Sequence, residues 1–196
     1  ATDNTVTVTW TTAGARTVKV NYTNPDNCTA PAATNFEVTV NQLPFATLTG
    51  GETICPTGSS ISNVTMAVGT GPYTLNIQNH GIVNNYNSGD NITVTPAATT
   101  TYTLLSVTDA NGCMVNAAPY LQGSATVTVR ALAAITVQPV DAIICEFNMT
   151  SFTVTATGTD ITYQWYVNDG GGWDPVIDGG IYFGATMNKL SLYGTT

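Results

Sequence analysis

The residues best suited to covalent or metal chemistry in this sequence are its four cysteines, Cys28, Cys55, Cys113 and Cys145. Zinc sites usually place two cysteines two to four positions apart and often add histidine. No two of these cysteines are that close, and His80 is the single histidine of the chain. The spacing therefore disfavours a zinc site and leaves disulfide bonds or free thiols.

A repeated strand pattern indicates which cysteines could pair. An alternating apolar strand leads into a proline-marked joint at residues 36–44, and a similar strand occupies residues 125–131. The copies lie about 90 positions apart, which is the length of one small β-sandwich domain. The chain is therefore interpreted as part of a tandem array, a class of protein that more often forms spacers, stalks or adhesive surfaces than enzymes.

This interpretation predicts a disulfide between Cys55 and Cys113, because both fall inside the one complete unit. A bridge closing a loop of this length would contribute about 4 kcal/mol to stability. Cys28 and Cys145 would find partners beyond the given sequence or remain free thiols, and a Cys28–Cys145 bond is the least favoured pairing. The predicted disulfide indicates an oxidising, extracytoplasmic compartment.

The sequence predicts no catalytic residue and no enzyme. His80 would have to be the base of a Ser-His-Asp arrangement, but it lies in an expected turn and the chain has no G-x-S-x-G motif. A pair of carboxylates for glycoside hydrolysis is equally unsupported, because the acidic residues concentrate in turns, where aspartate is common. These are Asp26, Asp90, Asp109, Asp169, Asp174 and Asp178.

Two weaker candidate sites surround a glycine-rich tip at residues 170–172. Asp169, Asp174 and Asp178 could supply hard oxygen ligands to calcium, although they lack the spacing of a calcium-binding loop. No other metal and no cofactor is expected. Trp173 is expected to fold back over its domain, and the alternative is an exposed ring that stacks on a sugar ligand.

Composition narrows the possible partners. The chain has 196 residues and a net charge of −8, with 43% hydrophobic and only 8% charged residues. An acidic surface with four cations repels nucleic acids and anionic lipids, so neither is an expected partner. No apolar stretch approaches the roughly 20 residues that a membrane-spanning helix needs, so direct membrane insertion is not expected.

Alternating threonine and valine predict an all-β fold, because β-branched side chains suit a pleated surface. Trp10 and Trp165, both in alternating segments, are expected in the core. Strands are expected at residues 5–10, 16–22, 36–40, 46–49, 61–68, 72–78, 91–94, 100–108, 124–130, 135–139, 152–158, 161–167 and 189–193.

Several of these segments resemble the immunoglobulin-like and PKD-like repeats of Bacteroidetes cell-surface proteins. The resemblance lies in Thr53–Gly58, Ile92–Leu104 and Val107–Cys113 of the middle unit, and in Ile144–Glu146 and Tyr163–Trp165 of the last unit. It implies tandem immunoglobulin-like or PKD-like β-sandwich domains, the first and last incomplete. Residues 1–43 would end a PKD-like domain, residues 44–131 would form a complete domain, and residues 132–196 would begin an immunoglobulin-like domain.

The resemblance also implies a function. Proteins built from such repeats are typically very large, leave the cell through the type IX secretion system, and include gliding-motility adhesins on the outer membrane. We therefore expect a structural or adhesive segment of an extracellular, outer-membrane surface protein. Its partners would be neighbouring repeats of the same chain, and surface polysaccharide or other adhesin subunits. The alternative is a carbohydrate-binding or ancillary module of a secreted hydrolase.

Overall fold

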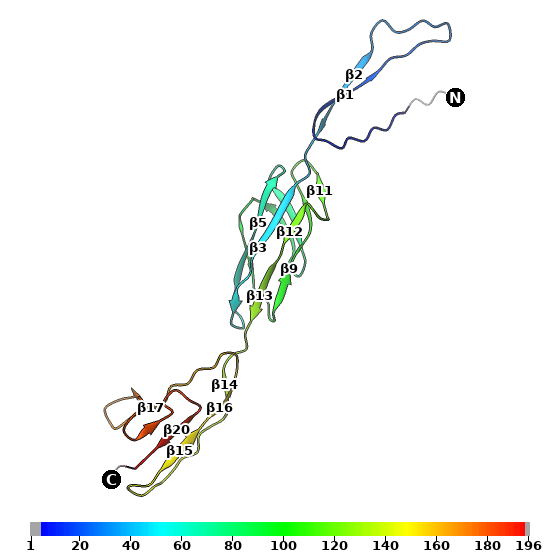
Figure 1. Cartoon of the computed structure of the whole chain (residues 1–196). Coiled ribbons are helices and arrows are strands. Elements are labelled where there is room, and N and C mark those ends of the chain that lie inside the picture. The colour runs from blue at the N-terminus through cyan, green and yellow to red at the C-terminus, as the bar shows by residue number, and fades with distance from the viewer. Residues whose placement is uncertain (1–4, 195–196) are drawn as a thin grey trace. The chain divides into compact units, whose positions relative to one another are not determined.

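The structure is a computed structural model that describes residues 5–194, and the regular secondary structure in that range consists of β-strands (Figure 1). This confirms the all-β prediction. The strands are β1 (Gly14–Val20), β2 (Thr34–Val40), β3 (Phe45–Gly50), β4 (Thr53–Ile54), β5 (Ser60–Val68), β6 (Tyr73–Ile77), β7 (Gly81–Tyr86), β8 (Asn91–Val94), β9 (Thr100–Tyr102), β10 (Leu104–Thr108), β11 (Met114–Val115), β12 (Leu121–Gly123), β13 (Ala125–Val129), β14 (Ala134–Val137), β15 (Thr150–Thr153), β16 (Thr155–Thr157), β17 (Tyr166–Val167), β18 (Asp174–Pro175), β19 (Tyr182–Phe183) and β20 (Lys189–Leu192).

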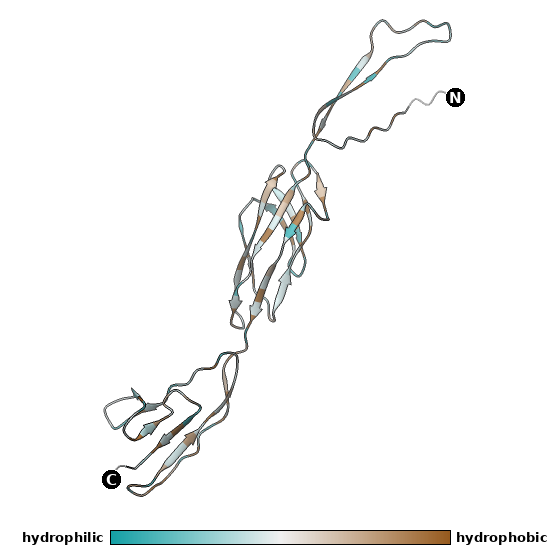
Figure 2. Ribbon diagram, in the orientation of Figure 1, coloured by the Kyte–Doolittle hydropathy of each residue, from teal (hydrophilic) through white to brown (hydrophobic). Residues whose placement is uncertain are grey.

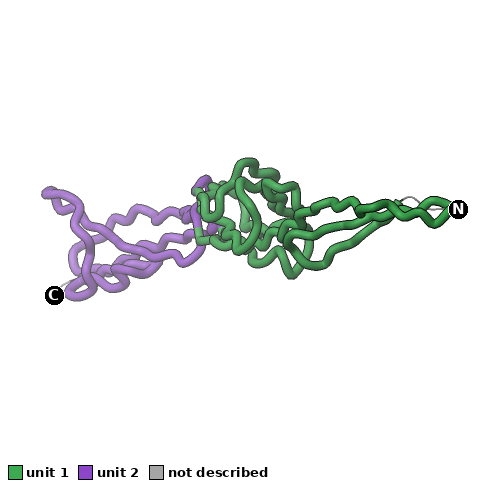
Figure 3. Tube along the Cα trace, turned by 90° about the horizontal axis from the view of Figure 1, so that it is seen from above, with its two compact units in different colours: residues 1–53, 59–128 green, residues 54–58, 129–196 purple. Residues whose placement is uncertain are grey.

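The chain divides into two compact units, coloured separately in Figure 3. The first unit contains residues up to 53 together with 59–128, and the second contains residues 54–58 together with 129–196. The three-part division expected at residues 43 and 131 stays a prediction. Within the described residues, no helix has the length and apolar character needed to cross a membrane.

Strands β3 to β13 form a β-sandwich that holds the main core of the molecule. The strand orders in its sheets are β12-β3-β5-β8, β11-β10-β6-β7 and β4-β13-β9. Because side chains alternate across a strand, each strand points every second residue inward. The core residues Leu48, Val64, Leu75, Val107 and Val127 are at most 1% exposed. Figure 2 shows where apolar residues fall along these strands.

The first segment of this sandwich, β3 and β4, runs parallel to its last segment, β12 and β13. β12 pairs with β3 through Leu121 opposite Ala46 and Gly123 opposite Leu48. Farther along, the Thr128 amide donates to the Glu52 carbonyl and the Arg130 amide donates to the Ile54 carbonyl, both at 3.0 Å. We call these contacts the parallel seam. A Cβ atom on Gly123 would lie 2.1 Å from the Leu48 carbonyl oxygen, so the strands approach closely only because this residue is glycine.

Before the sandwich, β1 and β2 pair antiparallel with Val18 opposite Phe36. The strand expected at residues 5–10 is not formed. Its alternation assigns residues to two faces, but a regular strand also requires a hydrogen-bonded ladder with a neighbour. Trp10, expected in the core, is only half-buried.

The second compact unit has a smaller core. Its sheets have the orders β14-β16, β15-β20-β19 and β17-β18. The buried residues Val176, Ala185 and Leu190 pack with the half-buried residues Trp165, Val167, Tyr182 and Leu192. Trp165 thus contacts the core as expected, but the strand predicted over residues 161–167 is reduced to the two residues of β17.

Candidate functional site

The cysteine Cys113 lies in a loop organised by a buried carboxylate, which joins β10 to β11. Asp109 is 5% exposed, and its Oδ1 accepts hydrogen bonds from the amides of Asn111 and Cys113, both at 2.9 Å. Its Oδ2 accepts a hydrogen bond from the Thr70 amide at 3.2 Å. The Asp109 amide donates to the Cys113 carbonyl, which closes the loop. We call residues 109–113 the late loop.

The same hydrogen-bond pattern recurs at residues 24–28, after β1. Asn24 Oδ1 accepts from the Asp26 and Cys28 amides at 3.1 and 2.8 Å, and the Asn24 amide donates to the Cys28 carbonyl at 3.0 Å. Asn27 has a φ of 62°, close to the 79° of Gly112 at the same position of the late loop. The two loops are therefore copies of one structural element.

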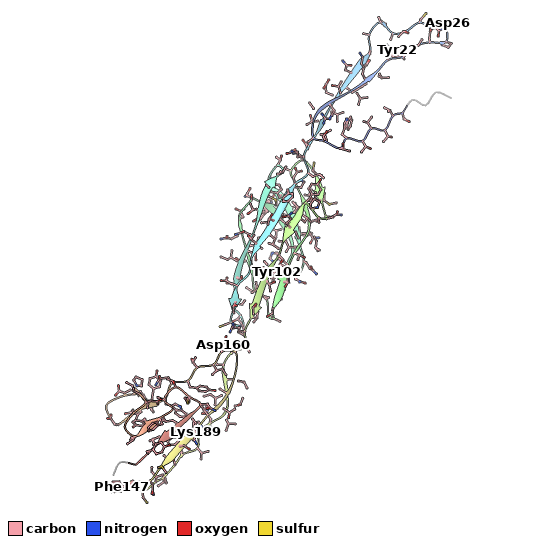
Figure 4. The ribbon with its side chains drawn as sticks, viewed as in Figure 1. Tyr22, Asp26, Tyr102, Phe147, Asp160 and Lys189 are labelled. Atoms are coloured by element: carbon pink, nitrogen blue, oxygen red, sulfur yellow. The ribbon has the colours of Figure 1, made fainter. Side chains whose placement is uncertain are left out.

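A second loop type also occurs twice. The Gly58 amide donates to the Cys55 carbonyl at 3.0 Å, and the Asn148 amide donates to the Cys145 carbonyl at 3.2 Å. The residue two positions after each cysteine has a positive φ, 67° for Thr57 and 64° for Phe147. Figure 4 labels Phe147 in the loop at residues 145–148 and Asp26 in the loop after β1. All four cysteines thus belong to repeated loops.

The disulfide predicted between Cys55 and Cys113 is not formed, because all four cysteines are free. Residues 52 and 54, just before Cys55, are hydrogen-bonded to residues 128 and 130. Cys55 therefore lies near the end of β13 where Val127 pairs with Thr100 of β9. Cys113 lies beyond Thr108, at the far end of β10. Residues 100–108 run along the sandwich between these positions, about 25 Å at the usual rise of a strand. A disulfide requires Cα atoms within about 7 Å.

The histidine and the acidic residues form no metal-binding cluster in the part of the chain that the structure describes. No three His, Cys, Asp or Glu side chains in residues 5–194 are arranged to hold a metal ion. The three calcium candidates are therefore not brought together. Asp178 instead accepts a hydrogen bond from the Ala185 amide at 2.7 Å, which is a structural role. His80 lies in the turn after β6, where its amide donates to the Ile77 carbonyl.

Trp173 does not fold back over its domain as expected, because 72% of it is exposed. It immediately precedes β18, which pairs with β17 through Val167 opposite Asp174 and Tyr166 opposite Pro175. Val167 packs into the core, so alternation directs Tyr166 and Trp173 to the outer face of this hairpin. Tyr166 is 53% exposed. Two aromatic side chains therefore lie exposed on one small surface.

Three tyrosines of the sandwich have altered acidities. Burial raises the pKa of Tyr102, and burial with the nearby Asp109 carboxylate raises the pKa of Tyr73. The pKa of Tyr86 is also raised, chiefly by burial. The Tyr86 hydroxyl accepts the Val64 amide at 2.7 Å, and its proton can be donated to the Asp90 or Val64 carbonyl at 2.8 or 3.0 Å. The hydroxyl thus ties β7 to β5 and to the turn before β8.

The second unit contains an open apolar groove of about 360 Å³ beside β14 and β16. Ile135, Val154, Ala156, Tyr163 and Trp165 line it. Ile135 and Val137 of β14 are each 56% exposed. Sequence reasoning did not find this groove, because an alternating strand pattern carries no information about which of its faces stays uncovered.

Comparisons with known proteins give the fold. No protein-family model and no curated protein matches the chain. Among solved structures, it resembles an I-band fragment of titin, with a TM-score of 0.51 and 13% sequence identity over 78% of this chain. A titin structure of three immunoglobulin domains, an E-to-A variant, gives a TM-score of 0.50 and 14% identity, also over 78% of this chain. The matches cover 56% of each titin chain. The domains are therefore immunoglobulin-like β-sandwiches.

Proposed function

We propose that the chain is a non-enzymatic structural or adhesive segment of a large cell-surface repeat protein, and that its complete sandwich resists tension. The parallel seam between the first segment of the sandwich, β3 and β4, and its last segment, β12 and β13, carries this proposal. The chain enters the sandwich at β3 and leaves it at β13. Tension along the chain therefore pulls on two segments that are hydrogen-bonded to each other.

The direction of the seam determines how it responds to tension. In a parallel pair pulled from opposite ends, the strands must slide past one another, so several hydrogen bonds carry the load together. In a hairpin pulled at its open end, the bonds break one at a time. Ala46, Thr128 and Arg130 take part in seam hydrogen bonds through their amides, and these bonds must fail together. The seam thus joins the first and last segments of the sandwich without a disulfide.

Several observations support placement at a cell surface. Cysteine loops of two types each occur twice, as in a repeat array. Only 8% of residues are charged, and neutral polar residues, which keep an extended array soluble without long-range charge, are plentiful. Export through the type IX system, display on the outer membrane of a Bacteroidetes cell and a part in gliding motility belong to this proposal and follow from the resemblance of the repeats.

Pulling single molecules by their ends tests the mechanical role. Residues 45–129 form the sandwich, so its extended chain is about 300 Å long at roughly 3.6 Å per residue, and unfolding should add this length less the span of the folded sandwich. We expect one cooperative force peak with this increment. Extension without a resolved peak would contradict the proposal, as would hydrolysis of polysaccharide or peptide substrates by the purified chain.

A carbohydrate-binding module is the second candidate, and the exposed pair Trp173 and Tyr166 favours it. Aromatic rings stack on the apolar faces of sugars, and two rings on one face can contact neighbouring units of a polysaccharide. Glycan-array binding by the purified chain should then be lost in Trp173→Ala. Tyr22→Ala is a matched control, because Tyr22 is also an exposed aromatic residue but belongs to the first unit.

A further inference from the structure

We propose that a polar pocket on the complete sandwich binds an uncharged sugar unit of a polysaccharide. The pocket has a volume of about 410 Å³ and is lined by the turn after β6, the end of β8 and the start of β9. This inference rests on the proposed adhesive function, to which it adds a binding site and a class of ligand. The polar lining residues are Asn79, His80, Thr93, Thr95, Thr100 and Tyr102.

Hydrogen bonds hold one wall of the pocket in place without a ligand. The Asn79 side chain donates from Nδ2 to the Thr101 carbonyl at 2.9 Å. The Gln78 amide donates to the Thr103 carbonyl at 2.9 Å, and the Thr103 hydroxyl donates to Gln78 Oε1 at 2.7 Å. The turn after β6 is therefore fixed against residues 101–103. Binding to such a pre-formed pocket avoids the entropic cost of ordering a loop.

The charges of the sandwich favour an uncharged ligand. Residues 45–129 contain neither lysine nor arginine that could balance a phosphate, a sulfate or a uronic acid. The three acids of this range, Glu52, Asp90 and Asp109, do not line the pocket. No group of His, Cys, Asp or Glu side chains within residues 5–194 could hold a metal ion there. Recognition in this pocket must therefore come from hydrogen bonds and apolar contacts.

The lining side chains match the two kinds of surface on a sugar ring. Hydroxyl, carboxamide and imidazole groups donate and accept hydrogen bonds, as sugar hydroxyls do. Val94 and Pro96 also line the pocket and offer apolar atoms to the C–H groups of the ring. The volume lies within the roughly 300–1,000 Å³ of small-molecule sites. A peptide is a poorer match, because peptide recognition usually needs apolar pockets for its side chains.

Tyr102 is the most buried polar residue of the pocket, and Figure 4 labels it. The residue is only 4% exposed, although it lines the pocket. Burial raises the pKa of Tyr102, whereas backbone hydrogen bonds also act on the pKa of Tyr86. A sugar hydroxyl in the pocket can bond to the Tyr102 hydroxyl where water is partly excluded, and hydrogen bonds are stronger in such surroundings.

An array of purified polysaccharides tests the class of ligand. The unmodified chain should bind neutral glucans, mannans, galactans or xylans, and it should not bind polyuronates or sulfated polysaccharides. Binding to the charged polymers alone, binding to a peptide array in place of the glycans, or no binding to either array would overturn the proposal. These results do not bear on the force peak of the sandwich, so the mechanical role is tested separately.

Paired substitutions locate the site. In calorimetric titrations with the neutral polysaccharide that gives the strongest array signal, Tyr102→Phe and Thr93→Val should each weaken binding about 3- to 10-fold, the usual effect of one lost hydrogen bond. Tyr73→Phe and Thr65→Val are matched controls and should bind normally. Tyr73 is buried like Tyr102, and Thr65 is exposed like Thr93, but neither lines the pocket.

Two further variants keep the test decisive. His80 is exposed, so His80→Ala should fold and should also weaken binding, even if Tyr102→Phe unfolds the sandwich. Trp173→Ala should bind normally, which separates this pocket from the exposed aromatic pair of the second unit. Normal binding by the folded pocket variants, or equal losses in the pocket variants and their controls, would overturn the proposal.

Discussion

At the scale of single residues, the buried carboxylate of Asp109 stabilises the sandwich by accepting three backbone hydrogen bonds. Asp109→Ala would remove the acceptor for the amides of Asn111, Cys113 and Thr70. Each buried donor left without a partner costs about 1–3 kcal/mol. Because part of this loop is exposed to water, we expect the free energy of unfolding to fall by about 3 kcal/mol in total. Urea denaturation should show a lower midpoint with an unchanged slope.

Asp109→Asn provides a graded control for that experiment. An asparagine keeps Oδ1 as acceptor for two amides, as Asn24 does in the copy of the loop after β1. It lacks the second carboxylate oxygen that accepts the Thr70 amide. We expect a loss of about 1 kcal/mol, the usual contribution of one such bond. Equal losses for the two substitutions would show that charge, not the acceptor geometry, stabilises the loop.

The buried tyrosines predict a loss of stability at alkaline pH. The pKa of Tyr73, Tyr86 and Tyr102 is raised above 10.0 in the folded chain, so the folded state holds these protons more tightly than the unfolded state. Their contribution is complete below pH 10.0 and is lost as pH rises through the folded pKa. The urea midpoint should therefore fall above pH 10.

Substitution of one tyrosine assigns that pH dependence. Tyr86→Phe cannot ionise, so its urea midpoint should fall less steeply above pH 10 than that of the unmodified chain, although it starts lower because the hydroxyl bonds are lost. Tyr22→Phe is the control, because Tyr22 is 69% exposed and should not change the slope. An unchanged slope in Tyr86→Phe would contradict the assignment.

At the scale of elements, the parallel seam depends on Gly123. Gly123 has a φ of +76°, and Gly112 has a nearly equal φ of +79° but open space around it. Gly112→Ala should cost about 1–2 kcal/mol for the left-handed backbone alone. Gly123→Ala adds the clash with the Leu48 carbonyl and should separate β12 from β3. Thermal melting should show a much larger loss for Gly123→Ala, and pulling should show a lower force peak only for that variant.

The strands that sequence reasoning found and missed show what alternation can specify. β3, β5, β8 and β13 were predicted because their inward residues recur at every second position. β7 was missed, because Gly81–Tyr86 places two asparagines before its buried tyrosine. β4 and β12 were missed because strands of two or three residues carry no measurable period. The parallel seam joins β3 to β12 and β4 to β13, so the period of the sequence predicted only one strand of each pair.

The candidate site could be predicted only in part, for a related reason. The turn around Asp109 was predicted from its residue types, but the burial of the carboxylate depends on Thr70, 39 positions earlier in the chain. The pairing of Cys55 with Cys113 failed because membership of one domain does not fix which end of the domain a loop occupies. Residues 100–108, which form β9 and β10, run along the sandwich between them.

At the scale of the whole molecule, the two compact units have cores of very different size. Fifteen apolar residues are buried in β3 to β13, whereas the second unit buries only Val154, Val176, Ala185 and Leu190. Because burial of apolar surface is the main stabilising term, the second unit should be much less stable. Separate cores also unfold independently unless a large interface couples them.

We therefore expect urea to unfold the chain in two steps, the second unit first. Trp165 packs against the small core, so tryptophan fluorescence should change mainly in the first step.

Leu190→Ala should lower only the first midpoint and Leu48→Ala only the second, because each truncates a buried leucine of one unit, with losses of about 2–5 kcal/mol. A single transition, shifted equally by both substitutions, would show that the units fold as one body.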